Sequence, residues 1–246
     1  MVYDDDIMDR KALQLLCRFA LPPNSLGYCG RGTAPEKFKA CILRGKCEGV
    51  EEELSKFIVL NPYLEMFRKI SKKEKFSYEA TEAYWLGGDI LKKAKLSDYK
   101  LLLKYFSKQG VPDWLVEDLK KQVPNKFVPL HLFQVLHVGV GRASGSVPYN
   151  LETINNCMVR WGEVIEICDS DLRLKLCLLE KRRQGYRLSK VEENISFRRD
   201  FLPGVRVGDV VAVHWGQAVK KLTKKEMASL EYWTTQVLES VGQSGT

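Results

Sequence analysis

The chain has 246 residues, of which 45% are hydrophobic and 28% charged, which is the composition of a folded globular protein. Its length favours one large domain or two small ones. The acidic start, residues 1–6, lacks the positive charge of an export signal, and no apolar run approaches the ~20 residues of a membrane span. We therefore expect a cytoplasmic protein without membrane insertion.

The formal net charge of +8 would suit a nucleic acid or an acidic protein partner. Much of the excess lies in clusters of mixed sign, such as residues 71–75 and 180–183. We interpret it as a solvated basic surface.

The seven cysteines are an odd number in a chain with no export signal, so we expect free thiols rather than disulfides. No pair has the C-x-x-C spacing of a zinc knuckle. Cys29, Cys41 and Cys47 are irregularly spaced with no histidine nearby, so we do not expect a structural zinc site there.

Residues 1–126 are predicted to form a helical domain. Apolar residues recur at helical spacing from Asp9 onward, and the first helix is expected to end at Pro22 and Pro23, because proline cannot continue a helix. A second helix is expected to begin at Pro35 and to stop at Gly45. Further helical patterns cover residues 50–60, 62–70, 78–86, 97–106 and 112–122.

Residues 127–154 are predicted to be a strand followed by a Gly/Ser-rich connection. The apolar run 127–140 is rich in valine, leucine and phenylalanine, which favours a buried strand. The glycine spacing of residues 139–148 resembles a dinucleotide loop only faintly, because Pro148 interrupts any helix directly behind it. We interpret this segment as a linker or an ordered turn.

Residues 155–246 are predicted to be mostly β. Residues 172–178 alternate strictly between apolar and polar, and residues 210–215 form another strand pattern. Thr223 and Glu226 form a capping box at the start of a last helix. The expected fold class is α+β: an N-terminal helical domain followed by a small OB-like β-barrel with a C-terminal helix.

Two of these strand patterns carry residues that can bind a metal. Cys157 opens the run 157–167, and His214 lies near the end of the run 205–218. A thiol at the start of one strand and an imidazole near the end of another can form a two-ligand metal site.

The same two runs resemble the HypC/HybG family of hydrogenase-maturation chaperones. Residues 157–167 read C-M-V-R-W-G-E-V-I-E-I, in the family's order of a cysteine, an apolar pair, a Pro-Gly position and a strand ending in Val-x-x-Ile. Residues 207–218 read V-G-D-V-V-A-V-H-W-G-Q-A and match its Val-Gly-Asp-x-Val-x-Val-His-x-Gly-x-Ala motif. The resemblance covers about residues 155–242. The N-terminal helical part shows no comparable motif.

The resemblance implies a chaperone that is not an enzyme and that helps to assemble or deliver the Fe(CN)2(CO) unit of a [NiFe]-hydrogenase. Cys157 matches the family's iron-binding thiolate, and His214 matches the histidine of the second motif. The implied partners are a HypD-like maturation protein and the hydrogenase large subunit. The chain departs from the family in two ways: Cys157 is internal rather than N-terminal, and Trp161 replaces the proline.

Three other residues are candidates for the same site. Cys29 lies in a glycine-rich loop beside Arg31, where an exposed thiol next to a cation ionises more easily, so it is a possible third iron ligand or transfer thiol. His131 and His137 lie six residues apart, so a strand would place them on one face. We interpret both histidines as buried structural residues, with one of them near the iron as the alternative.

Two other functions are possible. An OB-fold nucleic-acid-binding protein would explain the fold and the charge, with bases stacking on Tyr186, Phe197, Trp161 and Trp215. A thiol enzyme would use Cys157 as nucleophile and His214 as base, but no orienting acid is apparent.

Overall fold

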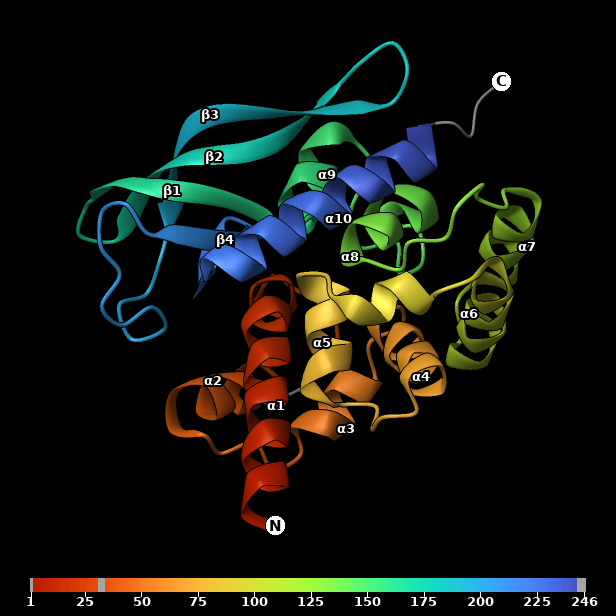
Figure 1. Cartoon of the computed structure of the whole chain (residues 1–246), viewed down its shortest axis with the longest axis horizontal. Helices are drawn as coiled ribbons and strands as arrows, with labels where there is room; N and C mark the ends of the chain where they lie inside the picture. The colour runs from red at the N-terminus through yellow and green to blue at the C-terminus, as the bar shows by residue number, and fades with distance from the viewer. Residues whose placement is uncertain (1, 31–33, 243–246) are drawn as a thin grey trace.

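The computed structural model of the protein describes residues 2–30 and 34–242 (Figure 1). Its helices and strands follow one another as α1 (Val2–Ser25), α2 (Ala34–Arg44), α3 (Val50–Ser55), α4 (Leu60–Ser71), α5 (Tyr78–Trp85), η1 (Asp89–Lys93), α6 (Leu96–Gln109), α7 (Asp113–Lys121), α8 (His131–Phe133), η2 (Gln134–Gly139), α9 (Leu151–Cys157), β1 (Arg160–Ile167), β2 (Asp171–Lys181), β3 (Tyr186–Ser196), β4 (Val210–His214), β5 (Gln217–Lys221) and α10 (Lys224–Gly242). The fold is therefore α+β, with helices first, then a five-stranded sheet and a C-terminal helix.

The helices expected from apolar spacing are confirmed for α2 and for α4 to α7, within about three residues at their ends, whereas α3 ends at Ser55 and not at the expected residue 60. The expected end of the first helix is wrong, because α1 continues through Pro22 and Pro23 to Ser25. Each proline lacks a backbone N–H, so the carbonyl four positions earlier loses its helical donor. The carbonyls of the prolines themselves are bonded, because Leu26 N donates to Pro22 O and Tyr28 N donates to Pro23 O.

The strand predicted over residues 127–140 is wrong as well. Residues 131–139 form α8 and the π-helix η2, and all of them are buried. A continuous apolar run has no period that separates a buried strand from a buried helix, so the pattern by itself was ambiguous. A short helix, α9, also begins directly behind Pro148 where none was expected. Asn150 caps it by accepting a hydrogen bond from Thr153 N at 2.9 Å.

The five strands pair in the order β1-β2-β3-β5-β4, and β4 returns to β1, so the pairing closes into a ring. The join between β3 and β5 is a single parallel pair, Ser196 with Gln217. Gly162 permits the close crossing of β1 and β2, since a Cβ atom there would lie 2.9 Å from the Leu176 Cα. The run 205–218 is not one strand, because β4 and β5 form a hairpin inside it.

The sheet separates two hydrophobic cores. The smaller one fills the ring and consists of Val164, Leu172, Leu174, Leu176, Ile195, Phe197, Leu202, Val211, Val213 and Ala218. The larger one joins the helices to the outer side of the sheet, where Trp161 and Trp215 are buried. Arg18 of α1 fastens the two parts together by donating to Phe201 O at 2.6 Å and to Val219 O at 3.2 Å.

The last helix, α10, lies across the sheet and α8 in Figure 1 and contacts both α8 and β3. It begins as expected, because Thr223 N donates to Glu226 Oε2 at 2.8 Å and Glu226 N to Thr223 Oγ1 at 3.2 Å. Within the described ranges, no helix has the length and apolar character needed to cross a membrane.

The expectation that all cysteines are free is wrong, because Cys41 and Cys47 form a disulfide with their Cα atoms 4.4 Å apart. Gly45, with φ of 66°, ends α2 and reverses the chain so that Cys47 returns to Cys41. The number of cysteines does not predict this disulfide, because the turn at the end of α2 is what brings Cys47 close to Cys41.

Candidate functional site

Three potential metal ligands converge between the helices and the sheet. The ligand atoms of His131, Cys157 and His214 all lie within 4.8 Å of one another, and all three residues are buried. They come from α8, α9 and β4. The structure thus brings together Cys157 and His214, which the sequence singled out, and adds His131; Cys29 is not part of the cluster.

Cys157 is held at the junction of α9 and the sheet. It is the last residue of α9 rather than the first of a strand, since β1 begins at Arg160. The Asn155 side chain donates to Leu179 O at 3.0 Å and accepts from Leu179 N at 2.8 Å, which fastens α9 to β2. Asn156 O accepts a hydrogen bond from Trp215 N at 2.7 Å. These contacts fix the thiol beside the end of β4.

His214 is oriented by the proline-containing end of α1. As the last residue of β4, it shares the outward face of the strand with Ala212, whereas Val213 points into the ring. Its Nδ1–H donates to Phe19 O at 2.7 Å. That carbonyl lacks its usual helical donor, because the residue four positions later is Pro23. The Nε2 atom of His214 is therefore an acceptor, buried and without a hydrogen bond among the described residues, although the Cys157 backbone lies near enough to raise the pKa of this imidazole against the larger effect of burial.

His131 uses both ring nitrogens in hydrogen bonds. Its Nε2–H donates to Cys157 O at 2.8 Å, because a carbonyl only accepts, and its Nδ1 accepts from the Tyr84 hydroxyl at 2.9 Å. The Cys157 sulfur lies 3.7 Å from the same Nε2. If the tyrosine accepted instead, the imidazole proton would move to Nδ1 and leave Nε2 free for a metal.

Burial keeps all three groups uncharged. It raises the pKa of the Cys157 thiol, and the nearby Cys29 adds to that rise. It lowers the pKa of His131 well below the usual range, where the His214 charge acts in the same direction, and lowers the pKa of His214 to about 4. Near neutral pH the imidazoles are in the form that binds metals, whereas the thiol must lose its proton when a metal arrives.

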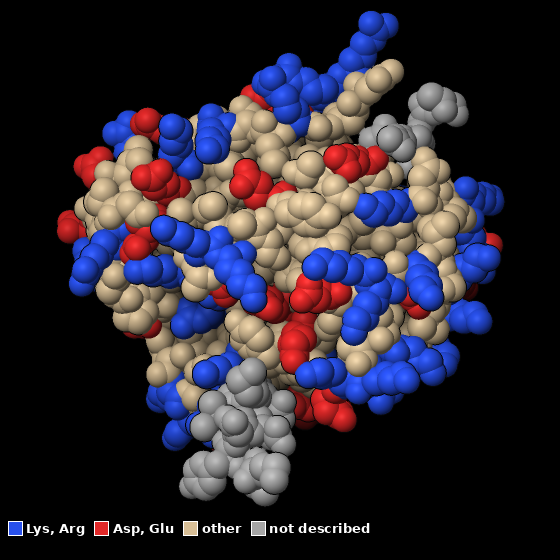
Figure 2. All heavy atoms as spheres, viewed as in Figure 1, with Lys and Arg blue, Asp and Glu red and all other residues tan. Residues whose placement is uncertain are grey.

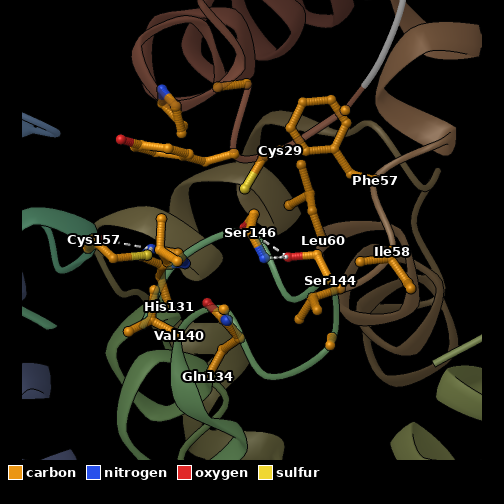
Figure 3. A pocket seen from close by; sticks show the side chains of 18 of the residues that line it. Cys29, Phe57, Ile58, Leu60, His131, Gln134, Val140, Ser144, Ser146 and Cys157 are labelled. Carbon is orange, nitrogen blue, oxygen red and sulfur yellow. Dashed lines mark hydrogen bonds between the residues drawn. The ribbon is translucent and has the colours of Figure 1, made fainter. Parts of the chain in front are cut away.

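The cluster borders a cavity of about 570 Å³. Figure 3 shows Cys157 beside His131, with Gln134 and Cys29 reaching toward the same space from other elements. Burial raises the pKa of Cys29 to about 11, so this thiol is not the exposed, easily ionised group that we expected. Its predicted neighbour Arg31 lies outside the described residues.

The turn between β4 and β5 places Trp215 over the cavity. Trp215 and Gly216 both have positive φ, 48° and 72°, as in a two-residue hairpin turn. A bulky residue at positive φ is rare and strained. The Trp215 ring packs against Tyr28 with centroids 4.7 Å apart, so it joins the loop after α1 to the end of the sheet.

The remaining predicted residues lie elsewhere or are covered. His137 is apart from the cluster and bonds to the Tyr99 hydroxyl at 2.9 Å, because six positions of a helical segment turn the two histidines to different faces. Of the proposed base-stacking aromatics, Trp161, Trp215 and Phe197 are buried. Lys and Arg side chains are interspersed with Asp and Glu on the face in Figure 2. Neither observation favours a nucleic-acid surface.

Trp85 is a site residue that the sequence did not select, and His131 was selected only as the alternative interpretation. Trp85 stacks on Phe19 with centroids 4.8 Å apart, and its centroid lies 4.4 Å from that of His131. The sequence offered His131 together with His137, six residues apart in a long apolar run, and did not distinguish between the two histidines. That run was interpreted as a strand, and a strand gave no reason to expect a contact between His131 and Cys157.

Comparison with known proteins identifies the family of this chain. No curated protein and no solved structure matches the chain significantly. A family model matches residues 8–246, which include both the helices and the sheet. The chain therefore belongs to the family of unknown function DUF6390.

Proposed function

We propose that this protein is a HypC-like chaperone for metal-cofactor assembly. It holds an iron unit of the Fe(CN)2(CO) type through Cys157, assisted by His214 and His131, and passes it on. The observation that carries the proposal is the convergence of Cys157 and His214 in one buried cluster, because these are the functional positions of the two motifs that resemble HypC/HybG.

The donor atoms suit a soft, low-valent metal. A thiolate and two neutral imidazoles are ligands that iron accepts, and three protein ligands leave positions open for ligands that the metal brings with it. His214 Nε2 is buried with no other partner among the described residues, and its Nδ1–H is held by Phe19 O, the outer-shell arrangement typical of metal-binding histidines.

The same geometry supports a reversible carrier. His131 Nε2 must give up its bond to Cys157 O before it can bind a metal, so binding competes with a hydrogen bond that the unloaded protein already makes. A volume of about 570 Å³ is also far larger than a single bare ion needs, and accommodates a metal with its own ligands.

In this proposal the closed ring of strands is an OB-like barrel that presents Cys157 and His214 at one end. The helices cover that end and contribute His131. The partners are a HypD-like maturation protein as the source and a hydrogenase large subunit as the recipient. The internal position of Cys157 is compensated by α9, whose contacts with the sheet fix the thiol.

Metal binding tests the site directly. The protein, purified anaerobically, is titrated with Co²⁺ as a spectroscopic substitute for iron, and the thiolate-to-cobalt charge-transfer absorption is recorded. We expect one equivalent to bind, Cys157→Ser to abolish that band, and His214→Gln to weaken binding about tenfold or more. Cys177→Ser is the control, because Cys177 is buried outside the cavity. A wild-type protein that binds no metal, or a band that survives Cys157→Ser, contradicts the proposal.

The identity of the cargo needs a second experiment. The protein is expressed beside hydrogenase-maturation proteins and purified anaerobically, and its iron content and infrared bands in the cyanide and carbonyl region are measured. We expect iron and such bands in the wild type and neither in Cys157→Ala. Absence of both from the wild type, with no maturation protein copurifying, would leave a metal site with a different cargo.

A further inference from the structure

Two buried N–H groups beside the cluster have no hydrogen-bond partner. The Nε1 atoms of Trp85 and Trp215 are both inaccessible to solvent and unpartnered among the described residues, and both tryptophans line the cavity. The two residues are 4% and 8% exposed. A buried N–H without an acceptor destabilises the folded protein, so such groups need an explanation.

Both indoles are next to the metal-binding groups. The Trp85 ring lies 4.4 Å from the His131 ring and 5.3 Å from the His214 ring, measured between centroids. Trp215 follows His214 directly, and its indole N–H lowers the pKa of the Cys157 thiol against the larger effect of burial. The Trp215 N–H nevertheless makes no hydrogen bond to the Cys157 sulfur or to any other acceptor among the described residues.

The charge of the cavity points to the chemistry of the missing acceptor. Among the described residues that line it there is no Asp or Glu, and its Lys56 is paired with Glu52 and Glu53. A ligand with negative charge therefore meets no opposing carboxylate in this cavity. Negative charge buried here needs hydrogen-bond donors in place of water, and the two indole N–H groups are donors without an acceptor.

We infer that Trp85 and Trp215 recognise a small anionic ligand of the metal through their indole N–H groups. The inference rests on the proposed function, whose iron unit carries cyanide, and adds the residues that hold such a ligand. An indole N–H only donates, so the pair selects an acceptor and rejects a ligand that presents its own hydrogens. The two donors fix the direction of the anion in the cavity.

Azide is a suitable probe, because it is a small anion that accepts hydrogen bonds and donates none. Co²⁺-loaded wild type, Trp85→Phe and Trp215→Phe are titrated with azide, and the visible absorption of the metal is followed. Each substitution removes an N–H and keeps an aromatic ring. All proteins are saturated with Co²⁺ before azide is added, and we expect about tenfold weaker azide binding in each variant, because each variant loses one hydrogen bond to a charged group. Trp233→Phe is the control, a buried tryptophan that does not line this cavity.

A measurement on the wild type avoids any loss of folding in the variants. The five indole N–H signals of the ¹⁵N-labelled, Zn²⁺-loaded protein are recorded with and without azide, and we expect two of them to shift. Equal azide affinity in all proteins, no shifted indole signal, or an effect of Trp215→Phe on the thiolate band alone overturns the inference and leaves the metal site intact. A wild type that binds no metal overturns both.

Discussion

At the scale of single residues, Pro23 determines which nitrogen of His214 faces the cavity. Having no N–H, it leaves the carbonyl of Phe19 available, and His214 Nδ1–H takes the place of the helical donor at 2.7 Å. The proton therefore stays on Nδ1 and the lone pair on Nε2. A proline near the end of α1 thus orients a histidine at the end of β4.

Pro23→Ala tests this coupling. The new N–H competes with His214 for Phe19 O, so the imidazole loses its fixed tautomer, and we expect Co²⁺ affinity to fall about tenfold with little change in the fold. Pro22→Ala is the matched control, because the carbonyl that it would engage belongs to Arg18 rather than Phe19. Equal effects of the two substitutions on metal affinity in a titration would refute the coupling.

His137 makes the stability of the protein depend on pH. Burial lowers its pKa to about 4 from a value of 6.5, with Arg142 acting in the same direction. The folded state thus binds fewer protons than the unfolded state, and stability present above pH 6.5 is lost as the pH falls toward 4. The loss amounts to about 2 kcal/mol between pH 7 and pH 5.

Urea unfolding of wild type and His137→Gln at pH 7 and pH 5 measures this contribution. The variant lacks the group that takes up the proton, so its free energy of unfolding should fall by about 2 kcal/mol less than that of the wild type over this range. His131 and His214 are present in both proteins and cancel in the comparison. The same pH dependence in both would assign no such role to His137.

At the scale of elements, α9 is the part that aligns the thiol with the sheet. It is seven residues long, too short to be stable by itself, and depends on its Asn150 cap and on the contacts of Asn155 with β2. The side chain of Asn155 binds the backbone of Leu179 as a neighbouring strand would. The short helix therefore behaves as an extension of the sheet edge.

Asn155→Ala is expected to lower the free energy of unfolding by about 2 kcal/mol, since two hydrogen bonds to backbone groups are lost. It should also weaken Co²⁺ binding, because the end of α9 carries Cys157. Asn194→Ala is the control, an exposed position on β3. Denaturant unfolding and metal titration check both effects, and a variant as stable as the control would show that α9 is held by other contacts.

At the scale of the whole molecule, the proposed metal joins parts that are distant in the sequence. His131 comes from the helical part, His214 from the sheet and Cys157 from the helix that connects them. The large core already spans this junction, so the site lies where the two halves meet. A metal bound there would stabilise the packing of the halves against each other.

Thermal unfolding measures that stabilisation. A ligand that binds only the folded state adds about 2.7 kcal/mol at a concentration of 100 times its Kd. We expect Co²⁺ under these conditions to raise the Tm of the wild type by several degrees, as ~1 kcal/mol shifts the Tm of a large domain by roughly 2–4 °C. Cys157→Ser should show no rise, whereas a rise of equal size in that variant would place the metal elsewhere.

The sequence by itself determined the elements whose signals are local. Helices α2 and α4 to α7 follow from apolar spacing, β2 from strict alternation, and the start of α10 from Thr223 and Glu226. It also identified Cys157 and His214 as a pair, because each lies in a motif that can be recognised without the fold. Each of these signals depends on residues close together along the chain.

Only the tertiary structure decided what depends on contacts between distant segments. The run 127–140 is buried on all sides, so its composition is the same for a strand and a helix, and the packing around it selects the helix that brings His131 to Cys157. The disulfide between Cys41 and Cys47, the unpartnered indoles and the fixed tautomer of His214 likewise arise from proximity in space. Residues that can bind a metal are recognised from their neighbours in the sequence, but only the folded chain brings them together into a site.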